Sequence, residues 1–338
     1  MVFSKIKNKL RIYYIQSKEL LSSRAKKASS TETDLLKSYS CANISDQNPD
    51  NWPKQIIYMA DGKLKHGGLA DRLRGIITLY DYCKKHNIEF KIHFVSPFQL
   101  KDFLEPSGYD WTINPDDITY DSNYSHPVFL DTYAWEPKME KLYERIVAKI
   151  KLKQHYRQLH VYTNYLYAEN KFGELFNELF TPSKTLQSYL DNEYKKLSGE
   201  YISISTRFLN ILGDFNETYQ GHEYLTPDEK TTLIETCICE IKKIQKENPG
   251  KIALVTSDSI SFLKKVKEQV DCHIIEGNIS HIDADNADNS ATFKTFLDFF
   301  MIANAAKSYL IIGRGMLNSN FSKRAAAINN HPFIIRHV

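Results

Sequence analysis

The sequence predicts an α/β protein with two Rossmann-like domains, each built on a doubly wound parallel sheet. Short apolar runs alternate with amphipathic segments of helical period, a pattern typical of parallel sheets with right-handed crossovers. The pattern starts again at Tyr201, and 338 residues are long for one core but sufficient for two. We therefore expect a basic segment and linker at 1–50, an N-terminal domain at 51–198 and a C-terminal domain at 199–338.

The composition favours a soluble globular chain in a reducing compartment. Hydrophobic residues make up 42% and charged residues 25%, and the net charge of +3 neither requires nor excludes an acidic partner. No nucleic-acid module is recognisable, so no nucleic-acid partner is expected. The five cysteines are scattered, without a disulfide framework or metal-ligand spacing. Because we also find no signal peptide and no long apolar span, we expect a cytoplasmic protein.

Residues 1–28 form a basic segment that leaves two interpretations open. They carry eight lysine or arginine residues and one glutamate, a net charge of +7. Apolar residues recur at roughly helical spacing, so the segment has the character of a peripheral helix on an anionic membrane surface. A solvated basic tail explains the charge equally well. The polar residues at 29–50 read as a linker.

The elements of the N-terminal domain follow in order. Strands are expected at 55–60, 90–95 and 127–131, a helix from Leu69 through Cys83, and mostly helical structure from 136 to about 197. The glycine pair before Leu69 makes the first unit a β-loop-α-β unit with a tight helix entry.

The C-terminal domain repeats the alternation. Thr226, Pro227 and Asp228 are a typical helix start, and Asn248, Pro249 and Gly250 end that helix. We expect strands at 201–207, 252–256, 272–275, 309–312 and 332–335, and helices at about 229–247, 259–270, 292–306 and from 321 onward.

The loop His66–Arg72 is the first of three candidate ligand loops. Gly67 and Gly68 let backbone N–H groups approach a ligand, and the following helix N-terminus adds partial positive charge. The loop lacks the GxGxxG spacing of a dinucleotide site. The alternative is a glycine turn that joins strand to helix, with Asp71 and Arg72 as a solvated pair.

The second loop follows Ser205, Thr206 and Arg207 and contains Asn210, Gly213 and Asp214. Ligands of open α/β sheets bind beyond the carboxyl ends of the strands, where the fork of donors on Arg207 suits a phosphate. Ser205 shares its face of the strand. The alternative is a strand-end arginine in a surface salt bridge.

The third loop contains Asn318, Ser319, Asn320, Phe321 and Ser322, ahead of the last helix. Hydroxyl groups and free N–H groups at a helix N-terminus again suit a phosphate. The alternative is an ordinary capping segment.

Two aspartates accompany these loops. Asp258 follows the strand at 252–256, where it is either a turn former or a ribose or base ligand. Asp298 lies on an otherwise apolar helix face, so its carboxylate must find a partner or reach an edge.

Together these motifs resemble the fucosyltransferase superfamily of GT-B glycosyltransferases, which includes α-1,2, α-1,6 and protein O-fucosyltransferases. Residues 66–75, HGGLADRLRG, are similar to its first-domain glycine loop, and residues 204–207, ISTR, to its VHxR strand end. Residues 257–258 resemble the (S/T)D turn. Asp298, the strand at 309–312 and residues 318–322, NSNFS, resemble its last motif. Three features depart from the pattern: Ser205 replaces the histidine, Phe208 replaces a second arginine, and residues 314–317 are inserted.

The resemblance implies an inverting, metal-independent transferase in which two domains face a cleft. The donor implied is a nucleotide sugar, with GDP-fucose as the first choice, and no further cofactor and no metal are expected. Asp283 and Asp285 match the letters of a DxD motif, but they lie in a polar loop rather than at a strand end.

We expect the C-terminal domain to hold the donor through Arg207, Ser319 and Ser322, which stabilise charge on the departing diphosphate. The resemblance adds Gly67, Gly68, Arg72, Ser205, Asp258, Asp298, Asn320 and Phe321 as donor-binding positions. The N-terminal domain would present a glycan or lipid-linked glycan acceptor, with Asp71, His66 or Asp61 as the candidate general base. A transferase with another donor and a non-catalytic nucleotide- or glycan-binding relative stay open as alternatives.

Overall fold

The computed structural model describes residues 30–39, 54–64, 66–130, 139–164, 169–214, 224–279 and 289–338. Its contacts divide the chain into two compact units. The N-terminal unit comprises the described residues up to 67 together with 71–97 and 108–171, and the C-terminal unit comprises 68–70, 98–107 and the described residues from 172 onward. Each unit contains a four-stranded parallel sheet, which confirms the predicted α/β fold with two Rossmann-like domains.

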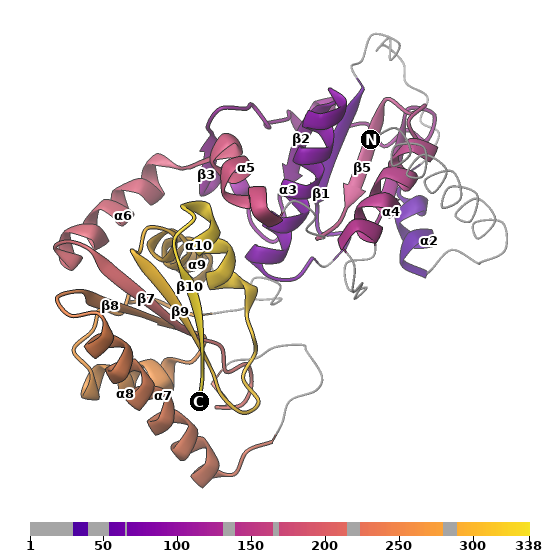
Figure 1. Ribbon diagram of the computed structural model, residues 1–338. Coiled ribbons are helices and arrows are strands. Elements are labelled where there is room, and N and C mark those ends of the chain that lie inside the picture. The colour runs from indigo at the N-terminus through magenta and orange to yellow at the C-terminus, as the bar shows by residue number, and fades with distance from the viewer. Residues whose placement is uncertain are drawn as a thin grey trace, which may run out of the picture. The chain divides into compact units, whose positions relative to one another are not determined.

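The sheet of the N-terminal unit has the strand order β2-β1-β5-β4, and all of its neighbours are parallel. Its elements are α2 (Ser30–Lys37), β1 (Gln55–Ala60), α3 (Leu69–His86), β2 (Glu89–Phe94), β4 (Ser125–Phe129), α4 (Met139–Leu152) and β5 (Gln158–Tyr162), drawn in indigo to magenta in Figure 1. Successive residues of β1 face opposite sides of the sheet. Ile57 and Met59 pack with Leu35 of α2, whereas Tyr58 faces Gly75 of α3.

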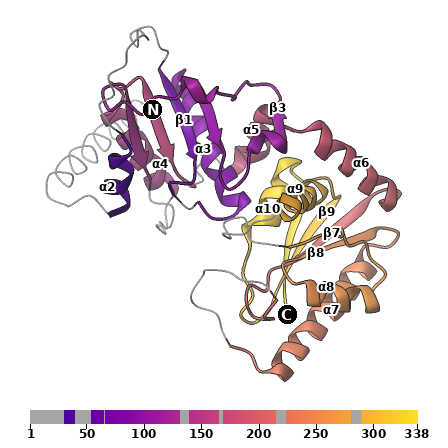
Figure 2. The ribbon, with the colours of Figure 1, turned by 180° about the vertical axis from the view of Figure 1, so that it is seen from behind.

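The C-terminal sheet has the order β10-β9-β7-β8 and is also parallel throughout. The elements of this unit are β3 (Leu104–Pro106), α5 (Phe172–Leu179), β6 (Phe180–Pro182), α6 (Lys184–Leu197), β7 (Tyr201–Thr206), α7 (Pro227–Glu247), β8 (Ile252–Ser257), α8 (Ile260–Gln269), α9 (Asn289–Ala303), β9 (Lys307–Ile312), α10 (Asn320–Ile328) and β10 (Phe333–His337). Figures 1 and 2 show α7 and α8 on one face of this sheet and α9 and α10 on the other. Short 3₁₀ turns occur at Leu100–Asp102, Pro115–Asp117 and Glu169–Lys171.

The boundary between the units differs from the expected division at 198. Residues 172–197 belong to the C-terminal unit because α5 packs against α10 and α6 against α9. A Cβ on Gly173 would lie 2.1 Å from the carbonyl oxygen of Ala327, so only glycine permits the approach of α5 to α10. The segment 98–107 joins the same unit, since the ring of Phe103 stacks on Phe296 of α9 with centroids 4.5 Å apart.

The expected helical stretch at 136–197 is wrong in part, because it contains the strands β5 and β6. All five residues of β5 are buried between two neighbouring strands. Its sequence, QLHVY, alternates polar and apolar residues over only five positions, which is too short a run to identify a strand. The polar residues Gln158 and His160 are buried all the same, because their side chains are hydrogen-bonded inside the unit.

Two shorter predictions are also corrected. The strand expected at 272–275 is a single bridge between His273 and Leu254, and the linker expected at 29–50 contains α2, whose Leu35 is buried in the core. The basic segment 1–28 and the Asp283–Asp285 motif lie outside the described residues.

Candidate functional site

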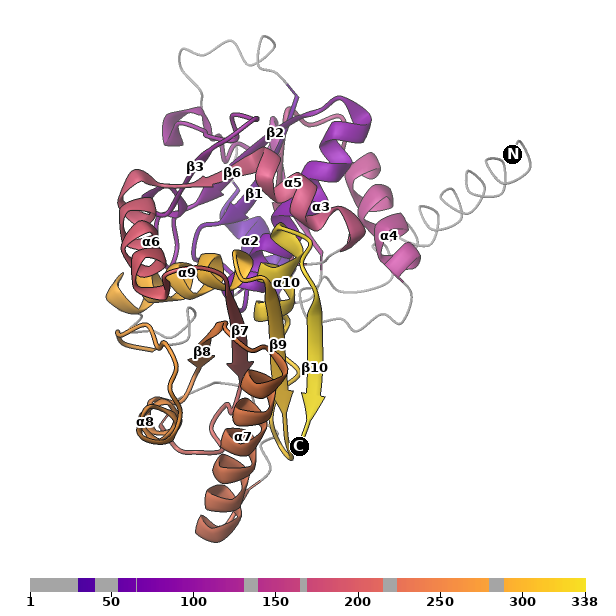
Figure 3. The same ribbon diagram turned by 60° about the vertical axis from the view of Figure 1, so that its left-hand side comes forward.

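The second and third candidate loops meet at the carboxyl edge of the C-terminal sheet. Since β8, β7 and β9 are parallel neighbours, the residues after each strand emerge side by side (Figure 3). The N–H of Leu317, in the loop after β9, donates to the carbonyl oxygen of Arg207 at 3.0 Å. Within this unit, the structure therefore brings the loop of Arg207 and the loop that leads to α10 together.

The inserted residues 314–317 make this connection. Met316 is buried, and its sulfur lies 3.9 Å from Sγ of Cys237 on α7. Arg314 forms an ion pair with Glu229 at 2.9 Å. The insertion thus anchors the loop after β9 to α7 as well as to β7.

Asp258 positions the backbone around Arg207. Its carboxylate accepts hydrogen bonds from the backbone N–H groups of Phe208 at 2.8 Å and Leu209 at 2.7 Å, and Nε of Arg207 lies 3.4 Å away. Burial raises the pKa of Asp258, while Arg207 and the two N–H groups lower it. Leu209 has a φ of 58°, in the left-handed region, so this carboxylate holds a turn that the backbone alone disfavours.

Of the two roles considered for Asp258, these contacts favour that of a turn former over that of a ribose or base ligand. Its side chain is 2% exposed, and both of its oxygens already accept from the protein. The structure therefore does not offer this carboxylate to a ribose or base. Arg207 retains 22% exposure of its side chain at the same edge.

The departures at Ser205 and Phe208 have structural explanations. The hydroxyl of Ser205 is hydrogen-bonded to that of Thr256 on β8 at 2.9 Å, and Ser205 is 6% exposed. Phe208 is fully buried, with its ring 4.8 Å from that of Phe262. Phe208 therefore belongs to the core, and Ser205 cross-links two strands.

The N-terminus of α10 has the features expected of an anion site. Ser319 is the N-cap and accepts from the N–H of Phe321 at 3.2 Å, and Asn320 is the first helical residue. Ser322 is 1% exposed, and its hydroxyl has no hydrogen-bond partner among the described residues. The ring of Phe321 packs on Phe299 at 5.2 Å, which fixes the first turn of the helix.

The buried carboxylate of Asp298 pairs with a lysine side chain instead of reaching an exposed edge. Its Oδ2 accepts from Nζ of Lys294, one helical turn earlier, at 2.5 Å. Burial raises the pKa of Asp298, and the positive charge of Lys294 opposes this. No interaction in the described part of the chain joins this pair to Arg207.

The buried side chain of Arg72 holds the glycine loop through hydrogen bonds to backbone carbonyl groups. Arg72 is 2% exposed and donates to the carbonyl oxygens of Gly67 at 3.1 Å and Ser96 at 3.2 Å. Gly67 has a φ of 77°, which favours glycine. Arg72 is therefore a buried structural residue and not half of a solvated pair. Gly68 directly precedes α3.

The three candidate bases differ in exposure. His66 is fully buried, and the centroid of its ring lies 5.8 Å from that of Tyr58 and 6.1 Å from that of Tyr162. Asp71 is 36% exposed and pairs with Arg74 at 2.8 Å. Asp61, directly after β1, is 5% exposed.

Asp61 belongs to a polar cluster that sequence reasoning missed. Its Oδ2 accepts from Lys63 at 2.7 Å and from the hydroxyl of Tyr162 at 3.0 Å. Burial alone would raise the pKa of Asp61, but the hydrogen bonds and charge of Lys63 hold it below its usual range. Nearby, the hydroxyl of Tyr39 lies 2.7 Å from Nδ1 of the buried His160.

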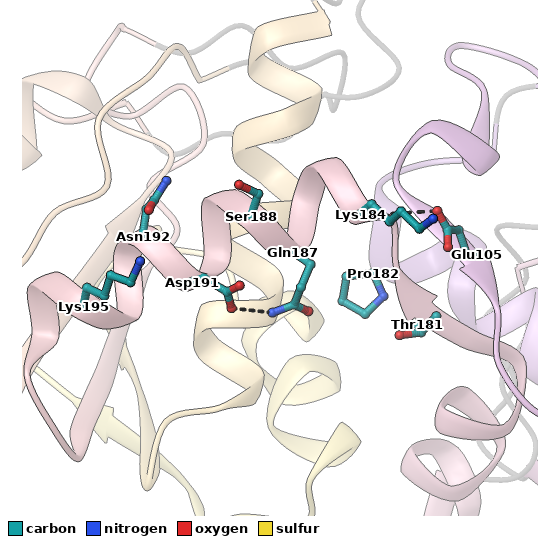
Figure 4. Close-up of a pocket in the computed structure, with 9 residues that line it drawn as sticks. All are labelled: Glu105, Thr181, Pro182, Lys184, Gln187, Ser188, Asp191, Asn192 and Lys195. Atoms are coloured by element: carbon teal, nitrogen blue, oxygen red, sulfur yellow. Dashed lines mark hydrogen bonds between the residues drawn. The ribbon is translucent and has the colours of Figure 1, made fainter.

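A surface pocket of about 460 Å³ lies elsewhere in the C-terminal unit, along α6 (Figure 4). It is lined by Glu105, Thr181, Pro182, Lys184, Gln187, Ser188, Asp191, Asn192 and Lys195. Figure 4 shows the amide of Gln187 turned toward the carboxylate of Asp191, at 2.7 Å. The lining contains none of the candidate residues.

Two further properties concern the described part of the chain. None of its helices is long and apolar enough to cross a membrane. It contains no cluster of three or more histidine, cysteine, aspartate or glutamate side chains suited to a metal ion.

No family model and no curated protein matches this sequence. Solved structures do match. A point mutant of FUT1 from Arabidopsis thaliana in complex with GDP aligns with a TM-score of 0.53 and 12% identity, over 96% of this chain and 78% of that one. NodZ α-1,6-fucosyltransferase co-crystallised with GDP aligns with a TM-score of 0.51 and 12% identity, over 81% and 92%. POFUT1 in complex with GDP aligns with a TM-score of 0.50 and 10% identity, over 86% and 99%. The chain therefore shares the fold of these fucosyltransferases.

Proposed function

We propose that this protein is an inverting, metal-independent glycosyltransferase that moves fucose from GDP-fucose to a hydroxyl of a glycan or glycolipid acceptor. The observation that carries the proposal is the 3.0 Å hydrogen bond from Leu317 to Arg207, because it joins two phosphate-suited features at one sheet edge. The likeness in fold to proteins crystallised with GDP supports the choice of nucleotide.

In this proposal the diphosphate lies against Arg207 and the first turn of α10. The guanidinium is a fixed positive charge, held beside Asp258 at 3.4 Å with 22% of the side chain exposed. The helix N-terminus adds partial positive charge and N–H donors. The hydroxyl of Ser322, which has no partner in the described structure, would gain one from a phosphate oxygen.

Catalysis would come from stabilising the charge that builds up on the departing diphosphate. Preorganised donors of this kind are often the largest single contribution to a rate, and removing one costs roughly 10²- to 10³-fold. The acceptor hydroxyl attacks the anomeric carbon, the bond to the diphosphate breaks, and a base takes the hydroxyl proton.

We assign the base to Asp71, which has the most exposed side chain of the three candidates. Asp71 lies in the first turn of α3 and is paired with Arg74 at 2.8 Å, so Arg74 must release the carboxylate for the proton transfer. The buried His66 would act only by positioning the loop.

The test is a transfer assay with GDP-fucose and a panel of glycan acceptors, with and without EDTA. We expect GDP release that depends on an acceptor, resists EDTA, and gives a product of opposite anomeric configuration. Arg207→Ala should lower turnover at least 100-fold, whereas Lys246→Ala, in the last turn of α7, should not. Full turnover by Arg207→Ala would refute the diphosphate clamp.

Two alternatives stay open, and one of them has specific support. The replaced histidine and arginine, Ser205 and Phe208, favour a non-catalytic nucleotide- or glycan-binding relative, which would bind GDP but transfer nothing to any acceptor. A transferase with another donor would turn over with UDP- or CMP-sugars in the same assay.

We further propose that the protein is cytoplasmic and rests on the inner face of a membrane through residues 1–28, where it builds surface polysaccharide. The net charge of +7 on this segment supports the proposal. Sedimentation with anionic vesicles should carry the full chain down but not a chain that starts at residue 29. Equal, negligible binding by both would refute it.

A further inference from the structure

Asp214, in the loop after β7, is held rigidly at the carboxyl edge of the C-terminal sheet. Its Oδ2 accepts a hydrogen bond from the hydroxyl of Ser259 at 2.9 Å and another from the backbone N–H of Ser261 at 2.7 Å. Both donors belong to the start of α8, which follows β8. These two hydrogen bonds therefore hold the carboxylate of Asp214 in one position.

The position of Asp214 is tied to that of Arg207. Ser259 follows Asp258 directly, and Asp258 lies 3.4 Å from Nε of Arg207 and binds the two N–H groups that follow it. The N–H of Ser259 also donates to Ser257, at the end of β8. Asp214 and Arg207 thus lie at neighbouring strand ends, connected through one short segment.

Asp214 differs from Asp258 in what it offers to a ligand. Asp258 is buried and both of its oxygens are occupied. Asp214 is exposed, and its Oδ1 accepts no hydrogen bond from the described residues. At this edge, Asp214 is the aspartate with an accepting oxygen to spare.

The chemistry of a nucleoside diphosphate indicates which group would bind to Oδ1 of Asp214. A nucleoside diphosphate whose phosphates lie on Arg207 and α10 continues into a ribose with two adjacent hydroxyl groups. A carboxylate oxygen accepts from such hydroxyls, as acidic residues do in other nucleotide-binding α/β sheets. In this arrangement the nucleoside extends from the diphosphate toward the end of β8.

We propose that Asp214 binds the ribose hydroxyls and makes the site selective for ribonucleotides over deoxyribonucleotides. This inference rests on the proposed function and adds to it a residue that determines specificity. The role that the sequence left open for Asp258 passes to Asp214.

The test is calorimetric titration of the full chain with GDP and with 2′,3′-dideoxy-GDP. We expect the wild-type chain to bind GDP roughly ten- to a hundredfold more tightly, since hydrogen bonds to a charged group are among the stronger ones. Asp214→Ala should weaken GDP binding to the level of the dideoxy compound and leave the affinity for that compound nearly unchanged.

Ser259→Ala is the matched control. It removes a partner of Asp214 and the N-cap of α8 but keeps the carboxylate, so the preference for GDP should persist. Equal affinity of the wild-type chain for both nucleotides, or an unchanged preference in Asp214→Ala, would overturn the inference while leaving the proposed function intact. Failure of the wild-type chain to bind GDP at all would contradict the proposed function and the inference with it.

Discussion

Replacing Asp258 with asparagine should both destabilise the C-terminal unit and weaken nucleotide binding. The carboxylate accepts from Phe208 at 2.8 Å and Leu209 at 2.7 Å, and it faces Arg207 at 3.4 Å. An asparagine of the same shape has one oxygen, so its NH₂ group would face one of these donors. The substitution therefore loses one hydrogen bond to a charged acceptor and weakens a second one.

The magnitude follows from the burial of the site. Hydrogen bonds to charged groups contribute about 1.5–3 kcal/mol each. Leaving a buried donor without a partner costs about 1–3 kcal/mol in addition. With a side chain only 2% exposed, little of this loss is recovered from water, and we expect the unfolding free energy to fall by about 3–5 kcal/mol.

The assay must report on the C-terminal unit. All three tryptophans lie at or before residue 135, so urea unfolding followed by far-UV circular dichroism is preferable to tryptophan fluorescence. Hydrogen exchange of peptides that cover 201–214 locates the effect. Asp271→Asn, at an exposed position of the same unit, is the control and should stay within about 0.5 kcal/mol of wild type. A stability of Asp258→Asn within 1 kcal/mol of wild type, with unchanged exchange and GDP affinity, would refute this account of the turn.

Four further substitutions or conditions test separate contacts. Ser322→Ala should leave stability unchanged or slightly raised, because the hydroxyl has no partner in the described structure, yet lower GDP affinity about tenfold; unchanged affinity in calorimetry would count against the anion site. Ser319→Ala removes the N-cap of α10 and should cost about 1 kcal/mol in urea unfolding, and no cost would contradict the capping contact. Gly75→Ala places a Cβ 2.1 Å from the carbonyl oxygen of Thr163 and should destabilise the N-terminal unit by about 3 kcal/mol, read from tryptophan fluorescence. Burial lowers the pKa of His160 from 6.5 to about 3, so the unfolded chain binds a proton that the folded chain does not. Stability of the N-terminal unit is then full above pH 6.5 and lost as the pH falls, by about 2 kcal/mol at pH 5, and a pH profile unchanged in His160→Gln would contradict this.

The parts of the fold that sequence reasoning predicted are those with a clear period. The helix α7 has a capping box at Thr226 and Glu229, and its observed bounds match the expected ones within two residues. The strand β7 was expected from its alternating apolar residues and its abrupt end at Arg207. These elements can be predicted from the sequence because their signals depend only on residues that are close together in the chain.

The parts that escaped depend on contacts distant in sequence. The strand β5 buries the polar residues Gln158 and His160, whose hydrogen-bond partners cannot be read from the local sequence. The domain boundary depends on the packing of α5 on α10 and of α6 on α9, which joins segments far apart in the sequence. The same holds for the site: the positions of Arg207 and α10 were expected, but the saturation of Asp258 and the fixed carboxylate of Asp214 arise from hydrogen bonds across 45 to 50 residues of chain.

The measurement that tests the central claim most directly is calorimetric titration of the wild-type chain and Arg207→Ala with GDP, UDP and CMP, each with and without EDTA. We predict binding that is selective for GDP, insensitive to EDTA and abolished by Arg207→Ala. Selectivity for UDP or CMP would keep the phosphate clamp but contradict GDP-fucose as the donor. The absence of binding by any nucleotide, or equal GDP binding by Arg207→Ala, would contradict the assignment of the sheet edge around Arg207 and α10 as a diphosphate site.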